Sequence, residues 1–228
     1  WNNGSNLIFR KKIEIDDNYL FKINQEVKNN SSEQVELYPY AQLTRKNIPE
    51  DLKGFYILHE GFIAVLDEEL KEDDYDDIEE KKIVREADKG WIGITDKYWM
   101  TALIPETGEK FKSTFLYQDA YKANFLLNNP KVVAPSAKAN NEIRIFVAAK
   151  EVQTIDAYAE KENIEKLDLI IDWGWFYFFT KPLFFAVDYL FKLTGNFGIA
   201  IVLITIMIRL VFFPLASYSF KSMAKMKA

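Results

Sequence analysis

The first 150 residues of the chain alternate between apolar and polar side chains in short segments. In the clearest segment, apolar residues stand at positions 19, 21, 23 and 27, with polar residues at 22, 24 and 26. A period of two places one face of a β-strand in a core and the other in solvent. We predict further strands at Val35–Gln42, Phe55–Leu66, Tyr98–Ile104, Lys110–Gln118, Ala123–Leu127 and Glu142–Ala148.

Clusters of turn-forming residues separate these strands. They lie at 16–18 and 29–32, and Glu106–Glu109 predicts a hairpin turn between two strands. Many short strands with turns between them are typical of an antiparallel β-sandwich. We therefore expect a mainly β domain over residues 1–168.

The periodicity becomes helical after Lys150. Apolar residues at 152, 155, 158 and 159 predict a short amphipathic helix over residues 151–162, which we expect to pack on the sandwich and close the domain. Residues 169–194 then combine an aromatic linker with a second helix. Trp and Tyr favour the headgroup level of a membrane, so the linker is where we expect the chain to reach the bilayer.

The second helix has predicted ends and a predicted charged stripe. We expect Thr180 to cap its N-terminus, Pro182 to occupy its first turn, and Gly195 to end it after Leu193. The charged residues Lys181, Asp188 and Lys192 are spaced seven and four apart, which puts them on one stripe of an otherwise apolar surface. This pattern predicts a helix that lies in the membrane interface, and the alternative is a helix packed on the β-domain.

The stretch Phe197–Leu215 is apolar except for Thr205 and Arg209. With its flanks, residues 195–217, it reaches the roughly 20 residues that a helix needs to cross a bilayer. An arginine near the centre of a membrane helix costs about 2.5–3.5 kcal/mol, and such residues tend to line polar cavities. Arg209 is also close enough to the helix end to extend to the headgroups. Thr205 stands four residues earlier on the same face and favours the polar lining.

Charge predicts the orientation of this helix. After Phe197 the charged residues are Arg209, Lys221, Lys225 and Lys227, without any acid. Short basic flanks stay in the cytoplasm, so we expect residues 218–228 to begin a cytoplasmic helical region. Removing these four positive charges from the net charge of −5 leaves −9 for the part before the span, which excludes a nucleic-acid-binding domain.

Other chemistry is sparse. The run Asp67–Glu80 carries ten acids in fourteen residues and predicts a solvated loop or hairpin tip. The chain has no cysteine and one histidine, His59, so we expect neither a metal site nor a cofactor. His59 is expected to be a packed residue, Asp96 a turn residue, and Trp91, Tyr98 and Trp99 core residues. An exported domain needs a signal or membrane helix before it, so we expect the chain to be a fragment whose N-terminal part, including the start of the sandwich, is missing.

Several motifs together resemble the YidC family of membrane protein insertases of Gram-negative bacteria. They are Leu167–Phe185, Gly195–Leu215 and Ser222–Lys227, preceded by Trp1–Ile13, Leu37–Arg45, Gly54–Gly61 and Gly90–Pro105. The resemblance covers essentially the whole chain. The two long C-terminal motifs are specific, because they join a Lys-Pro-containing interfacial helix to a lone intramembrane arginine.

The resemblance implies a fold and a function. The outer part would be a periplasmic β-supersandwich of the sugar-mutarotase type, followed by an α-helical membrane segment of a multi-pass inner-membrane protein. Arg209 and Thr205 would line a hydrophilic groove, open to the cytoplasm, that receives polar segments of nascent membrane proteins without covalent chemistry. The implied partners are nascent membrane proteins, the Sec translocon with its accessory subunits, the phospholipid bilayer and, through cytoplasmic parts outside this chain, the ribosome.

Two other functions fit parts of the pattern. The chain could be a membrane-anchored periplasmic binding or adaptor module in which Arg209 only anchors the helix. A carbohydrate enzyme would need two acids facing a pocket, and Asp96 beside Tyr98 and Trp99 is the single best candidate. The residues therefore favour an insertase over an enzyme.

Overall fold

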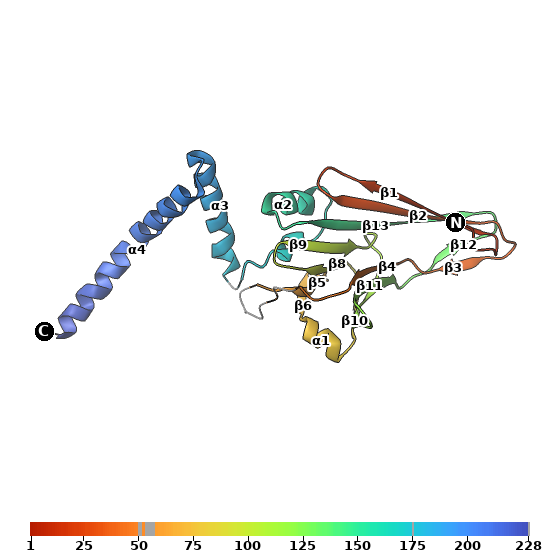
Figure 1. Ribbon diagram of the computed structural model, residues 1–228, viewed down its shortest axis with the longest axis horizontal. Coiled ribbons are helices and arrows are strands. Elements are labelled where there is room, and N and C mark those ends of the chain that lie inside the picture. The colour runs from red at the N-terminus through yellow and green to blue at the C-terminus, as the bar shows by residue number, and fades with distance from the viewer. Residues whose placement is uncertain (50–51, 53–57, 175, 228) are drawn as a thin grey trace. The chain divides into compact units, whose positions relative to one another are not determined.

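The computed structural model describes residues 1–49, 52, 58–174 and 176–227, with side chains as far as Tyr218. The chain divides into two compact units, Trp1–Asp172 and Trp173–Ala228. The first is a β-domain and the second is a pair of helices (Figure 1). A mainly β domain followed by a helical segment is the fold class that the sequence predicts.

Among its described residues, the β-domain has thirteen strands, one short helix within the strand region, and a closing helix followed by a 3-10 turn. The strands are β1 (Leu7–Ile15), β2 (Leu20–Asn29), β3 (Val35–Leu37), β4 (Tyr40–Arg45), β5 (Gly61–Leu66), β6 (Glu69–Asp73), β7 (Ile83–Ala87), β8 (Gly90–Thr95), β9 (Trp99–Ile104), β10 (Phe111–Tyr117), β11 (Tyr121–Leu127), β12 (Lys131–Val133) and β13 (Lys138–Ala149). The helices are α1 (Tyr75–Glu80), α2 (Val152–Lys161) and the 3-10 turn η1 (Leu167–Ile170).

These strands form antiparallel sheets that pack face to face. The seven-stranded sheet has the order β1-β2-β13-β9-β8-β5-β6, the four-stranded sheet has the order β4-β11-β10-β7, and β12 pairs with β3. Alternation along the strands puts Phe62, Phe115 and Phe125 into the core between the two larger sheets, each no more than 1% exposed. A fully buried side chain of this size contributes about 1.5–3 kcal/mol through the hydrophobic effect. The predicted antiparallel sandwich is therefore present.

A second core lies on the other face of the seven-stranded sheet. Helix α2 and the turn η1 cover Trp91, Met100 and Phe146 there. The indole N–H of Trp91 donates to the Glu165 carbonyl at 3.0 Å, so this buried tryptophan has a polar partner. Helix α2 occupies the range where helical periodicity predicts a packing element.

The structure differs from the sequence predictions at two strands and one turn. The segment Val35–Gln42 is two strands, β3 and β4, which pair with β12 and β11 in different sheets. Pro39 stands between them, and proline has no N–H for a sheet. The predicted turn is present, and in it the Glu109 N–H donates to the Glu106 carbonyl at 3.4 Å. It connects β9 of the seven-stranded sheet to β10 of the four-stranded sheet, so it is not a hairpin turn. Of Phe55–Leu66, the strand begins at Gly61, and residues 55–57 lie outside the described residues.

The acidic run is not a solvated loop, so that prediction is wrong. Only Asp67 and Glu68 form a hairpin tip, and the rest forms β6 and α1. Tyr75 and Ile78 on α1 are 2% exposed and close one side of the main core. Asp73, 6% exposed, accepts two hydrogen bonds from Arg85 of β7, at 2.6 and 2.7 Å. This ion pair joins the edge strands of the two sheets, because β6 ends one sheet and β7 ends the other.

Candidate functional site

The helix α4 (Phe197–Lys227) carries the predicted site residues. A stretch of 18 residues within Phe197–Tyr218 has a mean hydropathy of 2.6, and the helix is long and apolar enough to cross a membrane. As far as Tyr218, most of its side chains are not covered by other parts of the chain, as is expected of side chains that face lipid. The helix continues without interruption from the apolar stretch into the basic segment that the sequence analysis treats as a separate region.

The start of α4 has a cap that the sequence analysis did not identify. The side-chain oxygen of Asn196 accepts the Ile199 N–H at 3.2 Å, and the Asn196 carbonyl accepts the Ala200 N–H at 3.1 Å. Asparagine before a helical run is a preferred N-cap, so the dipeptide Gly195–Asn196 contained the signal for both a helix end and a helix start.

Thr205 and Arg209 are both exposed on α4. The Thr205 hydroxyl donates to the Ile201 carbonyl at 2.7 Å, which uses its proton and leaves its oxygen available to accept. Within the described part of the chain, Arg209 has no hydrogen-bond or ion-pair partner. The face therefore offers the donors of a guanidinium and one hydroxyl acceptor, a turn of helix apart. Such a pair can bind carboxylates or peptide carbonyls, and it contains no base that would activate the Thr205 hydroxyl as a nucleophile.

The preceding helix α3 (Tyr177–Thr194) starts earlier than predicted. Its N-cap is Phe176, whose carbonyl accepts the N–H groups of Phe179 and Thr180 at 2.8 and 2.9 Å. Thr180 is therefore not the cap; its hydroxyl donates to the Trp173 carbonyl at 2.8 Å, and Pro182 lies inside the helix. The aromatic residues that we assigned to a linker supply the first helical turn.

The end of α3 and its charged residues agree with the sequence pattern. Gly195 has a left-handed φ of 66° and its N–H donates to the Phe191 carbonyl at 2.8 Å, as a C-terminal glycine does. Asp188 and Lys192 form an ion pair at 2.7 Å. The ammonium of Lys181 lies 5.8 Å from the ring centres of both Trp173 and Tyr177. That this helix lies in a membrane interface stays a prediction.

The alternative candidates in the β-domain are structural. Asp96 accepts two hydrogen bonds from Arg45, at 2.5 and 2.7 Å, and its N–H donates to the Trp99 carbonyl at 2.8 Å, so it is a turn residue. His59 Nε2 lies 2.9 Å from the Phe62 carbonyl, in a packed position. Trp91 is a core residue as predicted, but Tyr98 and Trp99 are each 63% exposed and are not.

A polar cluster surrounds Lys150 at the end of β13. Burial lowers the pKa of Lys150, although the neighbouring acids, first among them Asp96, favour its charged form. Burial also raises the pKa of Glu72, which lies near His59 and Asp172. The Lys150 ammonium is buried and has no hydrogen-bond partner among the residues that the structure describes. Periodicity gives no signal for this cluster, because its members come from distant parts of the chain.

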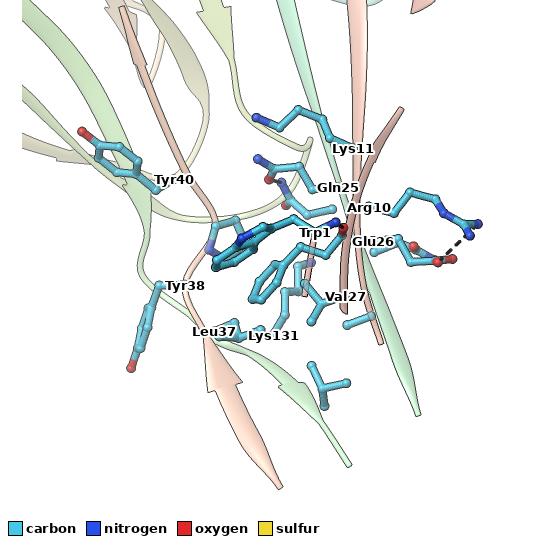
Figure 2. Close-up of a pocket in the computed structure, with 16 residues that line it drawn as sticks. Trp1, Arg10, Lys11, Gln25, Glu26, Val27, Leu37, Tyr38, Tyr40 and Lys131 are labelled. Atoms are coloured by element: carbon cyan, nitrogen blue, oxygen red, sulfur yellow. Dashed lines mark hydrogen bonds and ion pairs between the residues drawn. The ribbon is translucent and has the colours of Figure 1, made fainter. Parts of the chain in front are cut away.

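A groove of about 660 Å³ lies in the β-domain at some distance in sequence from the helices. Figure 2 shows Trp1, Tyr38 and Tyr40 around it, with Gln25 and Lys11 from the adjoining sheet. The sequence patterns did not predict this groove in the β-domain. The alternation of Tyr38, Pro39 and Tyr40 in the motif Leu37–Arg45 is the available signal, since two tyrosines flanking a strand break remain partly exposed.

Comparison with known proteins adds three findings. The family model described as the YidC periplasmic domain matches residues 1–186, and the model described as the 60Kd inner membrane protein matches residues 189–228. The chain is 50% identical over 227 residues to the membrane protein insertase YidC of Pelagibacter ubique, and 44% identical over 234 residues to that of Brucella melitensis. All of this chain is covered in both comparisons, but it spans only 40% and 38% of those relatives.

Among solved structures, the chain is similar to a galactose mutarotase related enzyme from Lactobacillus acidophilus. The TM-score is 0.45 with 11% identity, covering 62% of this chain and 61% of that one. A putative aldose 1-epimerase from Klebsiella pneumoniae gives a TM-score of 0.39 with 9% identity, covering 72% and 52% of the two chains.

Proposed function

The chain belongs to the YidC family of membrane protein insertases, and from this membership we propose that the full-length protein inserts nascent membrane proteins into the bilayer, with Arg209 and Thr205 lining a hydrophilic groove. The chain spans about 40% of its curated relatives, so the groove needs walls from elsewhere in the full protein. The substrate is a nascent membrane protein, and the site binds it without making or breaking covalent bonds.

The observation that supports the proposal is the arginine on α4. Arg209 is the only charged residue in the sequence of the span Phe197–Tyr218, and it is exposed. A guanidinium stays charged at every physiological pH. At about 4 Å from a carboxylate, its attraction rises from about 1 kcal/mol in water to about 4 kcal/mol at the reduced dielectric of a protein surface. It can therefore hold a polar substrate segment within the membrane while the apolar part of the substrate moves to lipid.

The positive charges after Phe197 support an orientation in which the end of α4 is cytoplasmic and the β-domain periplasmic. In this arrangement α3 lies in the periplasmic interface, with Lys181, Pro182, Asp188 and Lys192 at the headgroup level. Cooperation with the Sec translocon and its accessory subunits, and with the ribosome, belongs to the same proposal.

Replacement of Arg209 in the full-length protein tests this function. Arg209→Ala should abolish insertion of a Sec-independent substrate that carries an acidic translocated segment, at normal abundance of the variant. Arg209→Lys should retain part of the activity, because it keeps the charge and loses the planar donor set. Met207→Ala is the matched control, since Met207 is an exposed residue of the same helix without a charge.

Accessibility of the groove is measured separately. A cysteine at position 205 in an otherwise cysteine-free protein should react with a membrane-impermeant thiol reagent from the cytoplasmic side alone. Reaction from neither side, together with normal insertion by Arg209→Ala, would refute the groove and favour a membrane-anchored adaptor module.

A further inference from the structure

An exposed apolar patch lies at one end of the seven-stranded sheet. Its members are Tyr19, Tyr98, Trp99 and Val147, which are 60%, 63%, 63% and 39% exposed. The register pairs Trp99 with Ala149 and Thr101 with Val147, and the Val147 N–H donates to the Tyr19 carbonyl. Residues paired across an antiparallel sheet share a face. Trp99 and Val147 therefore share one face of the sheet. Tyr98 and Tyr19 lie in the turns just before β9 and β2 at the same end, where the Lys150 N–H donates to the Tyr98 carbonyl. We call these four residues at the end of the sheet the aromatic patch.

The aromatic patch lies at the end from which the chain leaves the β-domain. The His59 N–H donates to the carboxylate of Asp172, the last residue of the domain, at 3.1 Å. Two residues after His59, Gly61 pairs with Thr95, which precedes the turn that carries Tyr98. On the opposite face of the sheet, Ile170 shares a core cluster with Met100, the neighbour of Trp99.

The segment between this exit and the candidate membrane span is short. The span begins at Phe197, 25 residues after Asp172, and the segment between them exposes Phe176 and Phe178. A domain attached this closely keeps its exit end near the membrane surface, and a short tether gives a high effective concentration there. A weak contact between this end of the β-domain and the lipid headgroups is then enough to keep the domain at the membrane surface.

The side chains of the patch suit the headgroup layer. Tyr and Trp combine an apolar ring with a polar group and concentrate at membrane interfaces. The Lys97 ammonium lies 5.1 Å from the centre of the Tyr98 ring and adds a positive charge at the tip of the turn. The nearest acid in sequence, Asp96, is neutralised by Arg45, whereas Glu60, Glu72 and Asp172 face the buried Lys150.

We propose that the aromatic patch seats the periplasmic β-domain on the lipid headgroup layer. The occupant is lipid and not another protein, because the patch lies beside the membrane exit and consists of interfacial residue types with a lysine at its tip. The proposal rests on two parts of the proposed function, that α4 crosses the membrane and that α3 lies along its surface; it does not depend on the Arg209 groove. It assigns a purpose to the exposed pair within Gly90–Pro105, a motif that the insertase function leaves unexplained.

The test uses the full-length, otherwise cysteine-free protein in phosphatidylcholine vesicles. Ala149→Cys places an environment-sensitive fluorophore next to Trp99, since Ala149 is exposed and paired with it. Thr107→Cys is the matched control, because Thr107 is exposed beyond the other end of β9. Quenching is measured with a lipid that carries a nitroxide in its upper acyl chain and, separately, with aqueous iodide.

We expect lipid quenching several-fold stronger at position 149 than at position 107, and the reverse for iodide. Tyr98→Ser combined with Trp99→Ser should abolish the lipid quenching at 149 while Arg209-dependent insertion is retained. Iodide quenching alone at both positions would overturn the proposal, and so would lipid quenching that the double variant leaves unchanged. Protection from both quenchers at 149 would also overturn it, and would mean that protein covers the patch.

Discussion

The ion pair between Asp73 and Arg85 gives a sharp test of how the acidic run stabilises the sandwich. The Asp73 side chain is 8% exposed and the Arg85 side chain 27%, and the pair is bidentate. Removing one partner of a buried pair costs about 3–5 kcal/mol, because the other charge stays buried without compensation. We expect Arg85→Met to cost about 3 kcal/mol, the lower end of that range, since water reaches part of the site.

The two remaining variants complete a double-mutant cycle. Asp73→Leu should cost less than Arg85→Met, because the longer arginine side chain can reach solvent. The double variant should be close to the parent protein, since well-packed apolar residues often replace a buried pair without loss. The cycle then isolates the coupling between the two side chains.

Hydrogen exchange of the β6 and β7 amides in the full-length protein measures these changes. A loss of about 3 kcal/mol accelerates exchange through global opening by more than 100-fold, at about 1.4 kcal/mol for each factor of ten. An Arg85→Met protein with unchanged exchange, or a double variant as unstable as Arg85→Met, would refute the assignment of this pair as the connection between the sheet edges.

Three further predictions concern backbone space, titration and the turn between the helices. Gly93→Ala should destabilise the β-domain by about 1–3 kcal/mol, because a Cβ there would lie 2.3 Å from the Thr101 carbonyl oxygen; a thermal melt that does not shift would contradict this. Lys150→Met should raise the melting temperature at neutral pH. Because burial lowers the folded-state pKa of Lys150, the unfolded chain holds more protons between that pKa and the usual 10.5, so parent stability should rise with pH over this window. If the stability of Lys150→Met rises with pH as much as that of the parent protein, the Lys150 ammonium is not the source of the pH dependence. Gly195→Ala should cost about 1 kcal/mol or more, because φ is 66° there; it is measured as lower protection of the α3 C-terminal amides, and equal protection would exclude strain at this turn.

The sequence predicted where the strands lie along the chain better than it predicted which strands pair with one another. Alternation identified strands such as Lys110–Gln118, because one face of each is buried whichever strand lies beside it. It could not show that the turn Glu106–Glu109 connects different sheets, since a turn specifies a change of direction and not the next pairing. The structural role of the acidic run Asp67–Glu80 was missed because the prediction relied on its many acids and not on the spacing of its few apolar residues. Tyr75 and Ile78 stand three apart, which is helical spacing, and they are the two side chains that α1 buries.

The sequence predicted individual residues of the candidate site, but it did not predict the shape or the walls of the groove that they would line. Arg209 and Thr205 could be identified because charge and hydroxyl groups are rare in an apolar run. The groove that we propose around them cannot be derived from one helix. Tyr98 and Trp99 were assigned to the core because aromatic residues in a strand pattern are usually buried, but Tyr98 lies in the turn before β9 and Trp99 is its first residue, and both are exposed there.

The uninterrupted course of α4 has a mechanical consequence. Its 31 residues extend over roughly 46 Å at 1.5 Å per residue, whereas the hydrocarbon core is about 30 Å thick. In the proposed orientation, this one helix connects Arg209 in the membrane to a basic segment outside the lipid, with Pro214 between them. A change of about 10° in the tilt of the whole helix about its N-terminal end would move its C-terminal end sideways by about 8 Å. Engagement of a substrate at Arg209 could in this way be sensed outside the bilayer without any further moving part.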